Sequence, residues 1–198
     1  MTGDGLLDVV DSAEHRMIRD TVREFCQEEI APIAQEVENE HRFPQEVFDQ
    51  LGELDMMGVP VSEEYGGLGG DQLMYALVTE ELGRVSGGIG LSYAAHVSLG
   101  SKPIESFGTD AQKEEWLEPL ATGDGMGAWA LTEPGSGSDA SDMNTMAVKD
   151  GDEYVLNGTK QFITNANVAN SVLVKAVTEP DAGYDGISTF IVDPENDD

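Results

Sequence analysis

The feature that most constrains the fold is a single change of periodicity along the chain. Up to about residue 125, apolar residues recur at helical spacing, as Ile18, Val22 and Phe25 illustrate. After Gly125, short runs alternate apolar and polar residues, which is typical of strands. Because strands follow helices as a block, the order predicts an α+β fold and disfavours a doubly wound sheet. We expect an all-α helical domain over residues 1–125, then an incomplete antiparallel β domain, barrel-like or sandwich-like, over residues 126–198.

Five helices are expected in the first domain. The first spans residues 11–40, begins with a capping-box pattern of Asp11 and Glu14, and is kinked or divided at Pro32. The second runs from Pro44 to about Gly58, and the next two cover residues 71–84 and 89–99. The last opens with the capping box of Thr109 and Gln112 and continues through Leu120. The second helix is expected to bury the apolar side chains of Val47, Phe48, Leu51 and Leu54.

The β domain is predicted from three short apolar runs and two turn signals. The runs are "GAWALT", "SVLVKAV" and "ISTFIVD", which begin at Gly127, Ser171 and Ile187. The dipeptides Asp150-Gly151 and Asn157-Gly158 are typical of tight turns, so each predicts a β-hairpin.

Charge limits the classes of partner. The chain has 39 Asp and Glu residues against 10 Lys and Arg, a formal net charge of −29 at pH 7. Such a surface repels nucleic acid phosphates and anionic lipids, so we expect neither as a partner. At molar salt the Debye length falls to about 3 Å and the self-repulsion is screened. The composition therefore predicts a halophilic protein in a salt-rich cytoplasm.

Other features agree with a cytoplasmic location. The single cysteine, Cys26, excludes an internal disulfide and fits a reducing compartment. The N-terminal residues lack the basic and apolar regions of a signal peptide, and no apolar run is long enough to span a membrane. His15, His41 and His96 have no partner motif, so we expect surface or core histidines and no metal site.

The stretch "AWALTEPGSGSDASD", residues 128–142, is the first candidate site. Residues 135–140 fit a G-x-G-x-x-G/A fingerprint, but the hairpins begin too soon for the helix that a dinucleotide fold requires. Gly135 and Gly137 could still present backbone N–H groups to an anion, and Thr132 could present a hydroxyl to a ring system. The alternative is a turn that merely joins two strands.

The stretch "LNGTKQFITNA", residues 156–166, is the second. In a strand, Phe162 and Thr164 would share one face, where an aromatic ring beside a hydroxyl suits a flat heterocycle with a polar edge. The alternative is an amphipathic strand whose Phe162 belongs to the core.

Together these stretches resemble the acyl-CoA dehydrogenase family, flavoproteins that desaturate acyl-CoA thioesters between the α and β carbons. "ALTEPGSGSD" is similar to the family's first signature and "NGTKQFITNA" to its second flavin segment. "VPVSEEYGGLG", residues 59–69, is similar to a loop between its early helices. "SLGSKPIESFGTDAQKEEWLEPLATGD", residues 98–124, is similar to its lead-in to the β domain. The likeness runs in order over nearly the whole chain.

The resemblance implies FAD as cofactor and assigns roles in the first signature. Trp129 through Ser138 would wrap the flavin and its pyrophosphate. Leu131 and Thr132 would meet the pyrimidine edge of the isoalloxazine ring. Gly137 and Ser138 would contact phosphate, and Ser138 would also face the acyl-CoA substrate.

The second flavin segment receives roles in the same way. Phe162 stands where the family commonly has Trp, packed against the ring, and Ile163 is expected to contribute to the same site. Thr164 would hydrogen-bond flavin N5, the atom that accepts the hydride. A hydroxyl suits this position because it can both donate and accept a hydrogen bond. An electron-transfer flavoprotein is the implied electron acceptor, and a homotetramer is the implied assembly of the complete protein.

The resemblance also implies that the catalytic base lies elsewhere. In the family a Glu of a C-terminal helical domain removes the α proton, so we expect residues 1–198 alone to be inactive. Glu133 is the one carboxylate within residues 129–138, and its place before Pro134 suggests an ordering role. Three interpretations stay open: the N-terminal portion of an acyl-CoA dehydrogenase, a noncatalytic flavin-binding module, and a relative of the acyl-CoA oxidases.

Overall fold

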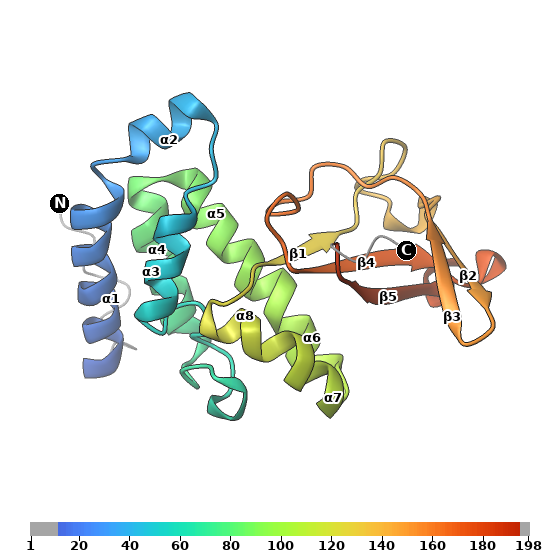
Figure 1. The fold of residues 1–198 in the computed structure, drawn as a ribbon, viewed down its shortest axis with the longest axis horizontal. Coiled ribbons are helices and arrows are strands. Elements are labelled where there is room, and N and C mark those ends of the chain that lie inside the picture. The colour runs from blue at the N-terminus through green and yellow to red at the C-terminus, as the bar shows by residue number, and fades with distance from the viewer. Residues whose placement is uncertain (1–11, 195–198) are drawn as a thin grey trace.

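Helices and sheet occupy separate parts of the computed structural model, which describes residues 12–194 (Figure 1). Eight α-helices precede the first strand: α1 Ala13–Phe25, α2 Ala34–Glu40, α3 Gln45–Glu53, α4 Gln72–Val85, α5 Gly87–Ala95, α6 Lys102–Phe107, α7 Asp110–Gln112 and α8 Glu118–Thr122. Three π-helical segments extend α1, α5 and α7: Cys26–Ile30, His96–Ser101 and Lys113–Leu117. Short 3-10 turns lie at Glu63–Tyr65, Ala140–Asp142 and Pro180–Gly186.

Four helices, α1, α4, α5 and α7, begin at a residue whose side chain caps the first turn. The capping box of Thr109 and Gln112 is confirmed, with both reciprocal hydrogen bonds present. At α1 a capping box is formed by Ser12 and His15. The predicted box began at Asp11, which lies outside the described residues. The predicted division near Pro32 is confirmed, because α2 begins only at Ala34.

The helical core lies between α1, α3, α4 and α5. Leu51, Val78 and Tyr93 are buried there, and the Tyr93 hydroxyl donates to the Met56 carbonyl at 2.9 Å. The second predicted helix ends at Glu53 and not at Gly58, which leaves Leu54 exposed instead of buried. No described helix is long and apolar enough to cross a membrane.

The sheet has five strands: β1 Gly127–Ala130, β2 Met146–Asp150, β3 Glu153–Asn157, β4 Ser171–Val177 and β5 Ile187–Val192. Their order is β1-β4-β2-β3, with β5 on β4, and the sheet is not closed. It is mixed and not purely antiparallel as expected, since β4 runs parallel to β1 and β2. The connection from β1 to β4 contains β2, β3 and two long loops, so it is long enough to bring β4 back parallel to β1.

The two predicted hairpins have different outcomes. Asp150-Gly151 forms the turn between β2 and β3, with Gly151 at φ 62°. Asn157-Gly158 makes no hairpin, because residues 158–170 contain no strand. Gly158 instead lets the chain pass directly against Thr145: an added Cβ would lie 2.3 Å from Thr145 Oγ1.

A second apolar cluster joins helices to sheet. Ile104 of α6, Leu120 of α8 and Leu173 of β4 are buried together, and Trp129 and Ile191 pack against them. This contact fixes the helical part against the face of β4.

Candidate cofactor site

A cleft of about 330 Å³ opens where the end of α5, the exit of β1 and the loop before β4 meet. Its helical wall is Ala95 and Leu99, and the remaining lining residues were all predicted from sequence: Trp129, Leu131, Thr132, Phe162, Ile163 and Thr164. The structure therefore brings together six of the eight predicted cofactor residues from two segments distant in sequence.

Gly137 and Ser138 do not line this cleft. Both are exposed on the loop between β1 and β2, and the position of a Cβ on Gly137 has open space around it. The helix that follows is the short 3-10 turn Ala140–Asp142, which agrees with the exclusion of a dinucleotide fingerprint. Their contacts with phosphate and acyl-CoA stay predictions.

Glu133 organises the loop that leaves β1. Its backbone closes a tight turn with Ser136, through N–H to carbonyl bonds of 2.8 and 3.2 Å. Its side chain is 4% exposed and accepts hydrogen bonds from the backbone N–H groups of Asn144 (2.6 Å) and Thr145 (2.9 Å). Lys160 Nζ lies 2.7 Å from Glu133 Oε1. The carboxylate thus ties both ends of the loop to the second candidate segment.

The electrostatics of Glu133 fit an ordering role. Burial by itself raises the pKa of this carboxyl, but hydrogen bonds from Lys160, Thr145 and Asn144 outweigh it and lower the pKa to about 2. A carboxylate that is ionised and fully engaged is a poor proton acceptor. The geometry therefore agrees with the expectation that Glu133 is not the base.

The second segment is fastened to the first by three further bonds. Lys160 Nζ donates to the Leu131 carbonyl at 3.0 Å, and Gln161 N–H donates to the Thr132 carbonyl at 2.8 Å. Gln161 Nε2 donates to the Glu133 carbonyl at 3.1 Å. Consequently Thr132 and the residues after Gln161 are held on either side of the same cleft.

The predicted strand through Phe162 and Thr164 is wrong. The segment is irregular, with Phe162 at φ 58° and Asn165 at φ 68°, so alternation of side chains does not apply. Both side chains reach the cleft by these left-handed turns instead. Phe162 is 87% exposed, which contradicts the alternative that it belongs to the core.

The donor set fits a flat heterocycle. Two hydroxyls, of Thr132 and Thr164, lie among the aromatic and aliphatic walls of Trp129, Phe162 and Leu131. Ligand sites commonly combine apolar walls with a few polar groups that fix orientation. No group of His, Cys, Asp or Glu in residues 12–194 could hold a metal ion.

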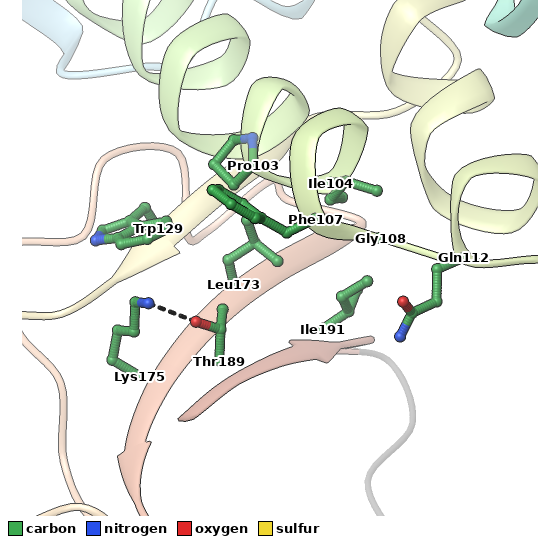
Figure 2. Close-up of a pocket in the computed structure, with 10 residues that line it drawn as sticks. All are labelled: Pro103, Ile104, Phe107, Gly108, Gln112, Trp129, Leu173, Lys175, Thr189 and Ile191. Carbon is green, nitrogen blue, oxygen red and sulfur yellow. Dashed lines mark hydrogen bonds between the residues drawn. The ribbon is translucent and has the colours of Figure 1, made fainter. Parts of the chain in front are cut away.

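A larger groove, of about 400 Å³, lies between α6, α7 and the face of β4 and β5 (Figure 2). Its walls are mainly apolar, with Phe107 over Leu173. Lys175 bonds the Thr189 hydroxyl at 2.5 Å and lies 4.8 Å from the centre of the Trp129 ring. Burial lowers the pKa of Lys175. Trp129 is the wall common to both cavities, yet only the smaller cleft gathers the predicted cofactor residues.

Sequence reasoning missed the residues that act behind the cleft. Lys160 and Gln161 lie within the quoted second segment, but their partners are 27 to 29 positions away. Asn165 was also missed. His96 was predicted only as a surface or core histidine, and it is buried. A buried polar side chain gives no signal in sequence until its partners are known.

Comparisons with known proteins identify the family of the chain. The sequence model of the acyl-CoA dehydrogenase N-terminal domain matches residues 12–124, and that of the middle domain matches residues 128–198. A probable acyl-CoA dehydrogenase of Bacillus subtilis is 50% identical over 180 residues, which are 90% of this chain and 47% of that protein. The chain thus spans about half the length of the curated relatives it matches.

Two solved structures are similar over nearly the whole chain. Acyl-CoA dehydrogenase complexed with FAD from Bacillus anthracis has a TM-score of 0.85 and 41% identity, over 94% of this chain and 32% of that one. A chain in a structure described as the electron transferring flavoprotein of Acidaminococcus fermentans has a TM-score of 0.91 and 42% identity, over 94% of this chain and 49% of that one.

Proposed function

The chain belongs to the acyl-CoA dehydrogenase family, and from that premise we propose that its cleft holds the isoalloxazine ring of FAD in an enzyme that desaturates acyl-CoA thioesters. The observation that carries the proposal is the meeting of Trp129, Leu131 and Thr132 with Phe162, Ile163 and Thr164 around one cavity. The FAD complex of the similar Bacillus anthracis protein supports the same cofactor.

Bound FAD would supply the hydride acceptor that a side chain cannot provide. Thr132 and Thr164 would orient the ring by hydrogen bonds to its polar edge, with Thr164 placed at N5. Phe162 and Trp129 would cover apolar ring surface and exclude water. Glu133 would act indirectly. Its carboxylate binds Thr145 and Lys160, and so joins the loop that carries Thr132 to the segment that carries Thr164.

The wider activity is proposed on the same basis. Removal of the α proton needs a positioned base, which we place outside residues 1–198. The similar chain described with an electron transferring flavoprotein supports such a protein as the electron acceptor. We also propose that the complete protein is a homotetramer and that it functions in a salt-rich cytoplasm.

One observation favours a second function, a flavin-binding module without catalysis. None of the eight residues that line the cleft has a side chain that exchanges a proton near neutral pH. This part of the chain therefore offers binding groups and no acid or base of its own.

Titration with FAD tests the proposal. The 198-residue chain, in about 2 M KCl so that self-repulsion is screened, should shift the visible spectrum of FAD and bind it saturably. Thr164→Val removes one hydrogen bond, worth about 0.5–1.5 kcal/mol, so affinity should fall roughly 2- to 10-fold. Thr159→Val, an exposed position in the same segment, is the matched control and should leave affinity unchanged.

The outcomes separate the two functions. Absence of FAD binding by the wild-type chain refutes the cofactor site. FAD binding without dye reduction by any of a panel of acyl-CoA thioesters favours the binding module. Dye reduction by the 198-residue chain would show that a base lies within it.

A further inference from the structure

Gly127, the first residue of β1, is a junction between three parts of the chain. Its backbone N–H donates to His96 Nδ1 at 3.0 Å. Its carbonyl accepts from Asn165 Nδ2 at 3.3 Å. Both polar groups of one residue are therefore held by side chains 31 and 38 positions away.

His96 extends the junction into the helices. It is fully buried, and its Nε2 lies 3.0 Å from the Leu120 carbonyl at α8. Since Nδ1 accepts from Gly127, the proton must be on Nε2, which then donates to Leu120. A neutral imidazole of one tautomer thus links the π segment after α5, helix α8 and strand β1.

Asn165 extends it into the loop before β4. The side chain is 6% exposed, and Nδ2 also donates to the Ser92 carbonyl of α5 at 2.9 Å. Its Oδ1 is buried and meets no donor in the described part of the chain. An apolar residue would fill the space without that penalty. The amide is therefore better explained by the bonds that Nδ2 donates to the Ser92 and Gly127 carbonyls and to Met126 Sδ.

The packing leaves no room for a side chain at Gly127. A Cβ added to Gly127 would lie 2.9 Å from the Cα of Gly100, so the strand rests directly on helix backbone. The distance of β1 from α5 and from the π-helical segment after it is therefore set by backbone contact and by the hydrogen bonds of His96 and Asn165.

Each wall of the cofactor cleft adjoins one member of this junction. Ala95 immediately precedes His96, Trp129 is two residues after Gly127, and Thr164 immediately precedes Asn165. We propose that His96 and Asn165 are positioning residues that fix the three walls relative to one another through Gly127. The inference rests on the proposed cofactor site and adds that His96 and Asn165 control this site although neither lines the cleft.

The test compares variants of the 198-residue chain by FAD affinity and by melting temperature. His96→Leu and Asn165→Asp should each weaken FAD binding by roughly tenfold or more, because small displacements of positioning groups have large effects. His96→Gln retains one donor and one acceptor and should restore most of the affinity. The double variant should lose less than the product of the single losses, because both residues act on Gly127.

His15→Leu is the matched control for a merely structural role. His15 is another buried histidine, bonded to Asp71 at 2.9 Å. Its hydrogen-bond partners, Ser12 and Asp71, do not line the cleft. This variant should lower the melting temperature and leave FAD affinity of the folded chain unchanged. If His96→Leu does not fold, Asn165→Asp alone tests the positioning role, because Asn165 lies in a loop.

The results that overturn the inference are distinct from those that overturn the site. A wild-type chain that binds no FAD refutes the proposed function and this inference with it. Wild-type binding with unchanged affinity in Asn165→Asp refutes the inference alone. An equal loss of affinity in His15→Leu, at an equal loss of melting temperature, also refutes it, since the effect would then follow from stability.

Discussion

Replacement of Glu133 by Gln gives the sharpest measure of how the loop after β1 is held. The hydrogen bonds around this buried carboxyl lower its pKa from an ordinary value near 4.5 to about 2. At 1.36 kcal/mol per pKa unit, the ionised form contributes about 3 kcal/mol to folding. Because the folded pKa is the lower one, this contribution is complete well above pH 4.5 and is lost as pH falls towards 2.

The ion pair of Glu133 with Lys160 leads to a similar free energy. Gln would leave the Lys160 ammonium, whose side chain is 10% exposed, without a counter-charge. Removal of one partner of a buried pair destabilises by about 3–5 kcal/mol. For a chain of 150–250 residues, roughly 2–4 °C of melting temperature corresponds to each kcal/mol, so Glu133→Gln should lower the melting temperature by about 6–20 °C.

The assay is thermal unfolding followed by circular dichroism at pH 7 in molar KCl. Glu153→Gln, at an exposed position of β3, is the matched control and should melt like the wild-type chain. The double variant Glu133→Gln/Lys160→Met should recover part of the loss, because the unpaired ammonium is gone. A Glu133→Gln variant that melts with the control would falsify the claim that this carboxylate holds the loop together.

Three further predictions concern salt, pH and backbone packing. Because of the net charge of −29, circular dichroism should show loss of structure below a few tenths molar KCl (roughly the range where screening weakens), and a spectrum independent of salt would contradict the halophilic interpretation. Burial lowers the pKa of His96 to about 4. Because the folded pKa is the lower one, the free energy of unfolding should fall by about 2 kcal/mol as the pH is lowered from 7 to 5. Urea titrations should show this loss in the wild-type chain and not in His96→Gln. Gly158→Ala places a Cβ 2.3 Å from Thr145 Oγ1 and should destabilise by about 1–3 kcal/mol; a melting temperature equal to wild type would show that the crossing is loose.

Local chemistry was sufficient to predict the order of elements and several of their ends. Helices α1, α4, α5 and α7 begin at residues whose side chains cap them, as Thr109 does at α7. Asp150-Gly151 forms its hairpin because Gly151 adopts φ 62° at no steric penalty. Such features depend on residues at most a few positions apart, so they are visible in sequence.

The assembly of the candidate site depends on contacts between segments that are distant in sequence. Asn157-Gly158 has the composition of a turn, yet Gly158 serves a close crossing with Thr145 that no local pattern reveals. Phe162 and Thr164 reach the cleft by left-handed turns and not by strand alternation, because Lys160 and Gln161 bind the exit of β1.

The sequence already shows which residue types are available to a flavin, since "ALTEPGSGSD" and "NGTKQFITNA" supply hydroxyls, aromatic rings and small residues in fixed spacing. It could not determine that His96 and Asn165 converge on Gly127, because each hydrogen bond joins positions more than 30 residues apart. Burial makes such bonds decisive: a polar group removed from water must find a partner inside the fold, and only the packed chain shows which one it finds.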